Sequence, residues 1–225
     1  MPNIKRGMMG AAGADTGEGA TLYAWGLGTS GATGQNDVIN RSSPVQVGAE
    51  NNWTSATGRF DGFNAIQDGT LWGWGDNAKG SIGDGTALSW SSPVQIGSGT
   101  DWERVSGGYR AVLAIKTGGT LWWWGDNEAG AHGQGNQSGN ASCPVQVGSL
   151  TDWATISSGK LDAVAAIKDD GTLWTWGAGA DGRCGHGDVI NRSSPVQVGS
   201  LDDWSLVDVG KEHMCAIKKD GTIWN

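Results

Sequence analysis

Histidine and cysteine are the side chains in this sequence best able to bind a metal or attack a substrate. There are three of each: His132, His186, His213, Cys143, Cys184 and Cys215. The cysteines follow no C-x-x-C spacing, and three cannot all pair within one chain, so we expect free thiols. The histidines are too few and too scattered to assemble a zinc site from neighbouring motifs. The sequence therefore predicts no metal site.

Acidic pairs and glycine-rich loops are the other candidates for chemistry. Asp169-Asp170 and Asp202-Asp203 lie at expected turns and at the entry to a strand, where Asp is favoured by turn geometry. The glycine-rich segment 75 to 85 lacks the Lys-Ser/Thr pair of a phosphate-binding loop. No Ser-His-Asp arrangement is identifiable, and His132 and His186 remain at most ligand contacts. We predict no catalytic residue and no cofactor, and expect a non-enzymatic role in binding or assembly.

Composition narrows the class of protein further. The 225 residues include 40 Gly and 14 Trp, and 15 basic residues face 23 acidic ones for a net charge of -8. An acidic chain without a basic stripe is not expected to bind nucleic acid. No apolar run approaches the roughly 20 residues of a membrane span, and the N-terminus lacks the apolar core of a secretory signal. So many Trp need burial, which favours a compact, turn-rich, all-β body.

The positions of the Trp residues reveal a repeat of about fifty residues. Trp-Gly recurs at Trp25, Trp74, Trp124 and Trp176, and a PVQVG or PVQIG segment begins at Pro44, Pro93, Pro144 and Pro195. A third series is Trp53, Trp102, Trp153 and Trp204, and a fourth is an Ala-Ile pair at Ala65, Ala114, Ala166 and Ala216. The segment DVINRSSPVQVG occurs at 37 to 48 and again at 188 to 199, which indicates recent duplication.

Each repeat contains the pattern of four short strands. An apolar segment such as AVLAIK (111 to 116) leads through a tight turn into a segment such as TLWWWG (120 to 125), and Asp-Gly turns like that at 68 and 69 favour hairpins. Four-stranded repeats of this length are typical of propeller blades. We predict an all-β fold, a β-propeller of about four four-stranded blades, in preference to a β-solenoid or a sandwich.

The expected organisation is an extended leader at residues 1 to 20 and a repeat domain at 21 to 225. The repeats are taken approximately as 21 to 69, 70 to 119, 120 to 171 and 172 to 221, with a partial strand at 222 to 225.

The repeats resemble those of the regulator of chromosome condensation family. The resemblance is carried by WGDNAKGSIGDG (74 to 85), WGDNEAGAHGQG (124 to 135) and VDVGKEHMCAIKKDGTIW (207 to 224). It implies a β-propeller, usually of seven blades. Members of that family include an exchange factor for a small GTPase that acts with chromatin, a plant ultraviolet photoreceptor and a secreted β-lactamase inhibitor. The net negative charge argues against a role on chromatin. Most Trp residues lie at the repeated positions, which indicates packing between blades and argues against light sensing.

Residues that depart from the repeat are the candidates for partner binding. Trp90 and Trp123 lie outside the repeated Trp series and could contact a protein or stack on a sugar. Lys5 and Arg6 belong to the leader, which is either disordered or a docking arm. A short basic, Gly/Ala-rich leader before propeller repeats resembles structural proteins of tailed phages.

The repeat begins on the third strand of a blade, near 21 to 25, and the last strand pattern is again a third strand. Strand exchange between copies is therefore conceivable through Thr222, Ile223 and Trp224. Three arrangements fit a repeat domain that begins and ends on a third strand. They are a four-bladed ring with a spare strand, an arc that assembles into a homo-oligomer, and part of a longer propeller.

These features lead to one functional hypothesis and its alternatives. The first is a non-enzymatic virion structural protein of a tailed phage, a tail or fibre component or a capsid decoration. Its propeller would be the interaction head toward a host-surface protein or glycan, and its leader would dock on other virion proteins. The alternative is a protein-binding scaffold or inhibitor in the bacterial cytoplasm, and a third is a glycan-binding propeller.

Overall fold

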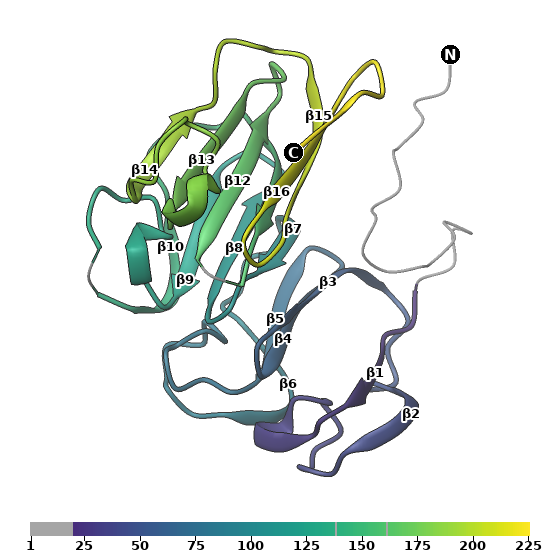
Figure 1. Cartoon of the computed structure of the whole chain (residues 1–225). Coiled ribbons are helices and arrows are strands. Elements are labelled where there is room, and N and C mark those ends of the chain that lie inside the picture. Colours follow the sequence, from purple (N-terminus) through teal and green to yellow (C-terminus); the bar gives the residue numbers. More distant parts are fainter. Residues whose placement is uncertain (1–19, 138, 161) are drawn as a thin grey trace, which may run out of the picture.

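The fold is an open arc of β-sheets (Figure 1). A computed structural model describes residues 20–225 apart from 138 and 161. In this described part, β1 to β17 form five antiparallel sheets that follow one another in sequence order. The prediction of an all-β propeller with about four blades is confirmed.

Three of the sheets are complete four-stranded blades. The first blade consists of β3 (Trp53–Arg59), β4 (Gly62–Gln67), β5 (Thr70–Gly75) and β6 (Trp90–Gln95). The second consists of β7 (Trp102–Gly107), β8 (Ala111–Lys116), β9 (Leu121–Gly125) and β10 (Ala141–Gln146). The third consists of β11 (Trp153–Ser158), β12 (Ala163–Lys168), β13 (Leu173–Gly177) and β14 (Arg192–Gln197).

Two partial sheets stand at the ends of the arc. The N-terminal sheet, β1 (Tyr23–Gly26) and β2 (Arg41–Gln46), matches the third and fourth strands of a blade. The C-terminal sheet, β15 (Trp204–Val209), β16 (Met214–Lys218) and β17 (Ile223–Trp224), matches the first three. Among the described residues, no hydrogen bond and no core cluster joins the two end sheets.

Local sequence explains why the strands turn where they do. Asp68 and Gly69, between β4 and β5, have φ values of 45° and 75°, and a two-residue hairpin turn of type I′ needs positive φ at both positions. The PVQ segments are the last three residues of β2, β6, β10 and β14, each at the outer edge of its sheet. An edge strand tolerates Pro because it has ladder positions without a hydrogen-bonding neighbour.

The third strand of each blade has two different faces. In β5, Leu71 points toward the following blade, where it joins a cluster with Trp102 and Trp124. Trp74 points toward the preceding sheet and donates its indole N–H to the carbonyl of Ala32 at 3.1 Å. Alternation along a strand therefore places Trp and Leu on opposite sides of the sheet.

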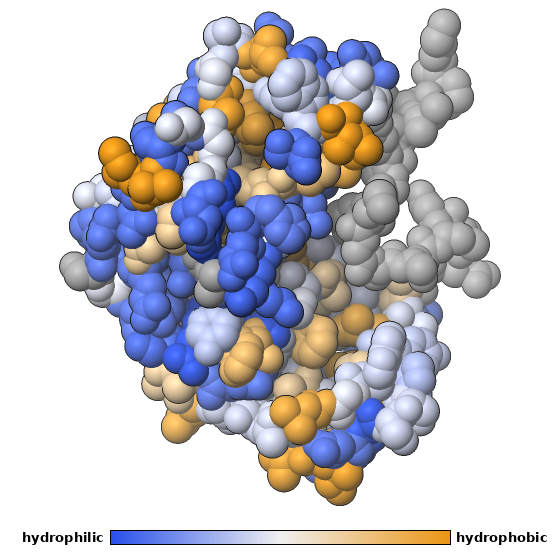
Figure 2. Space-filling model, in the orientation of Figure 1, coloured by the Kyte–Doolittle hydropathy of each residue, from blue (hydrophilic) through white to orange (hydrophobic). Residues whose placement is uncertain are grey.

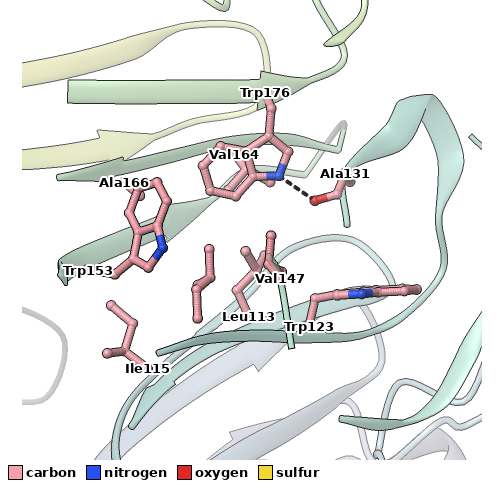
Figure 3. Close-up of a cluster of buried hydrophobic side chains, with 10 residues drawn as sticks. Leu113, Ile115, Trp123, Ala131, Val147, Trp153, Val164, Ala166 and Trp176 are labelled. Atoms are coloured by element: carbon pink, nitrogen blue, oxygen red, sulfur yellow. Dashed lines mark hydrogen bonds between the residues drawn. The ribbon is translucent and has the colours of Figure 1, made fainter. Parts of the chain in front are cut away.

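The core is divided into layers between successive sheets. One layer, between the second and third blades, combines Leu113 and Ile115 of β8 with Trp153 of β11 and Trp176 of β13 (Figure 3). Similar clusters occupy the other junctions. Because every blade is buried on both faces by its neighbours, stability depends on each neighbouring pair.

Candidate protein-binding face

The edges of the blades form two unlike faces. We call one the loop face; it carries the turns between first and second strands and the long loops between third and fourth strands. Backbone bonds tie these together: the N–H of Asp76 donates to Asp61 at 2.7 Å, and that of Asp126 to Arg110 at 3.0 Å. The long loops contain the short 3-10 turns η1 (Thr29–Gly31), η2 (Glu128–Gly130) and η3 (Ala180–Gly182).

We call the opposite side the turn face; it carries the short turns between second and third strands. There a lysine lies between two Trp rings in three of the sheets. Lys116 Nζ is 4.7 Å and 4.8 Å from the ring centroids of Trp102 and Trp122, and 3.0 Å from Asp101 Oδ1. The equivalent lysines are Lys168 and Lys218. Such cation–π contacts are structural, since the lysine is already paired.

The loop face carries an exposed aromatic cluster at the junction of the first and second blades. The rings of Phe60 and Tyr109 lie 4.6 Å apart, and the Arg110 guanidinium lies 5.0 Å from the Tyr109 centroid. The Phe60 side chain is 57% exposed. Its backbone N–H donates to the Tyr109 carbonyl at 3.2 Å, which holds the two turns together. We call Phe60, Tyr109 and Arg110 the aromatic cluster.

A partly buried cation, Arg59, supports this cluster from below. The Arg59 guanidinium donates to Asn64 Oδ1 at 2.8 Å, to Ser81 Oγ at 2.8 Å, and to the carbonyls of Trp74 and Asp76, both at 3.0 Å. Burial lowers the pKa of Arg59 to about 10, still high enough for a charged side chain at neutral pH. These four bonds fix the turn that presents Phe60.

Acidic side chains lie farther along the same face. Asp126 is buried and contacts Lys79 Nζ at 3.6 Å, so it bridges the loops of the first two blades. Burial raises the pKa of Asp162 to about 7, with further increases from the charges of Glu128 and Asp126. A carboxyl group of this face therefore titrates near neutral pH.

The structure treats the two extra Trp residues differently. Trp123 is only 5% exposed and packs on His132, with ring centroids 4.5 Å apart. Its proposed partner-binding role is therefore wrong: Trp123 belongs to the core (Figure 3). Trp90 is 39% exposed and donates to Asp84 Oδ2 at 2.8 Å, so its role in binding stays a prediction.

The prediction for Trp123 was wrong because the sequence does not show which residue its side chain faces. In the first blade Gly73 lies against Ile82, a small residue against a large one. In the second blade Trp123 lies against His132, whose Nε2 is 3.0 Å from Asn136 Oδ1 and whose Nδ1 accepts the N–H of Gln134 at 2.8 Å. A single sequence shows both changes but does not show that the two positions touch.

The remaining sequence candidates stand as follows. Lys5 and Arg6 lie outside the described residues. Ile223 and Trp224 form β17 and pair with β16 of their own sheet, while their side chains are 67% and 54% exposed. Exchange of residues 222 to 224 between copies is not tested by this pairing and stays a prediction.

The described residues contain no group of three or more His, Cys, Asp and Glu side chains that could hold a metal ion. No helix in that part of the chain is long and apolar enough to cross a membrane. Sequence reasoning missed the aromatic cluster and the turn-face lysines. The lysines had a signal in the sequence: in the same three repeats, an Asp directly precedes the first-strand Trp and a Lys directly follows the Ala-Ile pair.

Comparisons with known proteins agree with this architecture. The family model for the regulator of chromosome condensation (RCC1) repeat matches residues 68–115 and 170–217. Among curated proteins, an X-linked retinitis pigmentosa GTPase regulator homolog of Caenorhabditis elegans is 39% identical over 66 residues, which cover 28% of this chain and 5% of the relative. The mitochondrial RCC1 domain-containing protein RUG3 of Arabidopsis thaliana is 32% identical over 91 residues, 39% of this chain and 20% of the relative.

Solved structures match over most of the arc. Human WBSCR16 has a TM-score of 0.80 at 22% identity, covering 89% of this chain and 54% of its own. Prp20p of Saccharomyces cerevisiae, described with its binding properties to Gsp1p and histones, has a TM-score of 0.75 at 17% identity, covering 87% and 51%. The chain thus spans about half of these structures and a small part of the curated relatives. Repeats and fold together support an RCC1-type β-propeller.

Proposed function

We propose that this chain is a protein-interaction module that binds its partner through the loop face. The observation that carries the proposal is the aromatic cluster: an exposed Phe60 ring, packed at a tilt against Tyr109 and held in place by the bonded Arg59. Rigid aromatic and Arg side chains are the types that dominate the binding energy of protein interfaces. The similarity to Prp20p, which is described with protein partners, supports a protein ligand.

The test compares one residue of each face. The full chain, its Phe60→Ala variant and a Leu150→Ala control are immobilised, and proteins retained from a lysate are quantified. Leu150 is 45% exposed and lies between a fourth and a first strand, on the turn face. A protein retained by the unmodified chain is then purified and titrated directly against all three.

We expect Phe60→Ala to weaken binding by about tenfold or more, as loss of a central aromatic does in known interfaces. Leu150→Ala should bind as the unmodified chain does. Equal affinity of all three, or loss of binding in Leu150→Ala alone, would contradict a loop-face interface.

A finer form of this proposal places the propeller in a virion. There it would serve as a non-enzymatic tail, fibre or capsid-decoration protein, with residues 1 to 20 as the docking segment; a cytoplasmic scaffold or inhibitor is the alternative. Support comes from the leader composition and the duplicated segment at 37 to 48 and 188 to 199. Quantification of the chain in purified particles decides the matter, since its absence from particles would exclude the virion role.

A further inference from the structure

The second repeat differs from the others three positions before its first-strand Trp. It has Gly99 there, where the other repeats have Glu50, Leu150 and Leu201. The φ angle of Gly99 lies outside the left-handed region, so the backbone does not require glycine at this position. The effect of the glycine is to leave out a side chain.

A side chain at position 99 would stand directly over polar groups of the second blade. Its Cβ would lie 3.3 Å from Trp102 Nε1, 3.3 Å from Asp101 Oδ1 and 3.7 Å from Lys116 Nζ. It would therefore cover the indole N–H together with the ion pair of Asp101 and Lys116, whose charged atoms are 3.0 Å apart.

The sheets that keep a Leu at this position show the covered state. In the third blade, Trp153 Nε1 and Asp152 Oδ1 are both sealed from solvent, and neither has a hydrogen-bond partner in the described part of the chain. In the C-terminal sheet the same is true of Trp204 Nε1 and Asp203 Oδ1. A ligand does not reach these groups.

In the second blade a pocket of about 260 Å³ opens at the corresponding place. Its lining includes Trp102, Lys116, Asp84 and the apolar side chains of Ile96 and Pro144. Trp102 is only 6% exposed, and its N–H has no hydrogen-bond partner among the residues that the structure describes. Unlike the N–H groups of the covered sheets, it is not sealed from solvent. An unused donor therefore faces the pocket.

The pocket combines apolar and polar groups, which lie mostly in separate patches on the face seen in Figure 2. Trp102 offers a donor, and the Asp101 carboxylate beside it offers acceptors. The charges of Lys116, Asp101 and Asp84 sum to -1, which disfavours an anionic ligand. The volume is below the roughly 300–1,000 Å³ of sites for drug-sized ligands, so the bound group is small.

We propose that this pocket binds a carboxamide group. Its carbonyl oxygen accepts the Trp102 N–H, its NH₂ donates to the Asp101 carboxylate, and its alkyl part lies against Ile96 and Pro144. The carboxamide belongs either to a free amide or to an Asn or Gln side chain of a peptide. The pocket lies beside the Lys116 contacts of the turn face, so the inference is independent of the partner proposed for the loop face.

The first test follows the indole N–H of Trp102 by nuclear magnetic resonance. The full chain is isotope-labelled at its Trp residues, and a Trp102→Phe variant identifies the resonance by its loss. Titration with propionamide should shift this resonance saturably, with a dissociation constant in roughly the millimolar range expected of so small a ligand. Sodium propionate, which has a similar shape but is anionic, should bind more weakly by about tenfold or more.

The Gly99→Leu variant is the matched control, because it copies Leu150 of the third repeat. Unchanged resonances of the other indoles show that the variant is folded. Its affinity for propionamide should fall by about tenfold or more, since the new side chain covers Trp102. The absence of a saturable shift in the unmodified chain, equal affinity for propionate, or equal affinity in Gly99→Leu would overturn the proposal.

The reverse substitution, Leu150→Gly, applies the same test to the third blade. There Lys168 contacts Asp152 and the Trp153 ring as Lys116 does in the second blade. Removal of the Leu side chain should expose the Trp153 N–H, so that propionamide shifts its resonance in the variant and not in the unmodified chain. A Trp153 resonance that stays insensitive in Leu150→Gly would overturn the role given to this position.

Peptides distinguish the two sources of the carboxamide. Acetyl-Ala-Gln-Ala-amide and acetyl-Ala-Glu-Ala-amide share a backbone and differ in one side-chain group, and the Gln peptide should bind more tightly by about tenfold. If the Gln peptide also binds more tightly than propionamide, the source is a peptide side chain; if it binds more weakly, the source is a free amide. Equal affinity of the Gln and Glu peptides would overturn the assignment of the pocket to a carboxamide.

Discussion

Asp162 shows how the packing of successive blades changes a single side chain. Burial raises its pKa to about 7, and the nearby charges of Glu128 and Asp126 raise it further. In the unfolded chain an Asp has a pKa of about 3.9. The folded state therefore binds more protons than the unfolded state between about pH 4 and pH 7. By linkage, the contribution of Asp162 to the free energy of unfolding falls as the pH rises through this window.

Replacement of Asp162 by Asn removes this penalty. At pH 8 we expect the variant to be more stable than the unmodified chain by roughly 1–3 kcal/mol, after allowance for solvent screening. At pH 4 the two should differ little, because the carboxyl is then protonated when folded. Urea unfolding at both pH values measures the difference. The same difference at pH 4 and pH 8 would show that Asp162 ionises normally.

Each turn-face lysine lies on a second strand and pairs with an Asp beside the neighbouring first strand. The first blade lacks this ion pair and can be compared directly with the third blade, which has it. In the third blade, Lys168 lies 3.2 Å from Asp152 and between the rings of Trp153 and Trp174. In the first blade, neutral residues occupy the same positions, and Gln67 donates to Asn52 Oδ1 at 2.6 Å. One strand geometry therefore accepts either an ion pair or a pair of amides.

The double substitution Asp152→Asn/Lys168→Gln copies the first blade into the third. Lys168→Gln alone should cost about 1–2 kcal/mol of unfolding free energy, because it removes a buried cation–π contact and leaves Asp152 without its cation. The double variant should cost less than the sum of the two single variants, since the amides bond each other. Urea unfolding of all four chains measures the coupling, and strict additivity would contradict it.

Strand identity was predictable here because the same short pattern returns four times. The Asp-Gly turn at 68 and 69 follows from local backbone geometry, and the structure confirms it. The PVQ segments lie in the fourth strands, but each of these strands begins three residues before its Pro. The loop-face site was not predictable, because Phe60 and Tyr109 meet across the junction of the first and second blades and are about fifty residues apart in the repeat. Contacts of this kind depend on how blades stack, which no local pattern contains.

The whole molecule behaves as a linear array, in which a residue's contribution depends on whether its blade has two neighbours. Trp124, between two blades, is 0% exposed, whereas Trp25 at the equivalent position of the end sheet is 61% exposed. The sequence alone gives both the same Trp-Gly context. Their different surroundings arise only from the order of the sheets along the arc.

Alanine substitution at these two positions should therefore have very different effects on folding. Trp124→Ala should lower the free energy of unfolding by about 3–5 kcal/mol through loss of packing and a cavity. Trp25→Ala should change it by no more than about 0.5 kcal/mol, measured at a concentration where the chain is monomeric. Denaturant unfolding monitored by circular dichroism makes the comparison, and similar losses at both positions would mean that Trp25 is buried in solution.

The junction between successive sheets is built in the same way three times, which has a consequence for how such a chain can change in length. Its hydrogen bonds join a Trp indole and a Ser carbonyl to backbone groups of the long loop, whatever side chains that loop carries. A duplicated unit therefore arrives with both halves of its junctions already compatible with its neighbours. The identical segments at 37 to 48 and 188 to 199 are what such modular growth would leave behind. Blade number can thus vary while the exposed loop residues diversify independently.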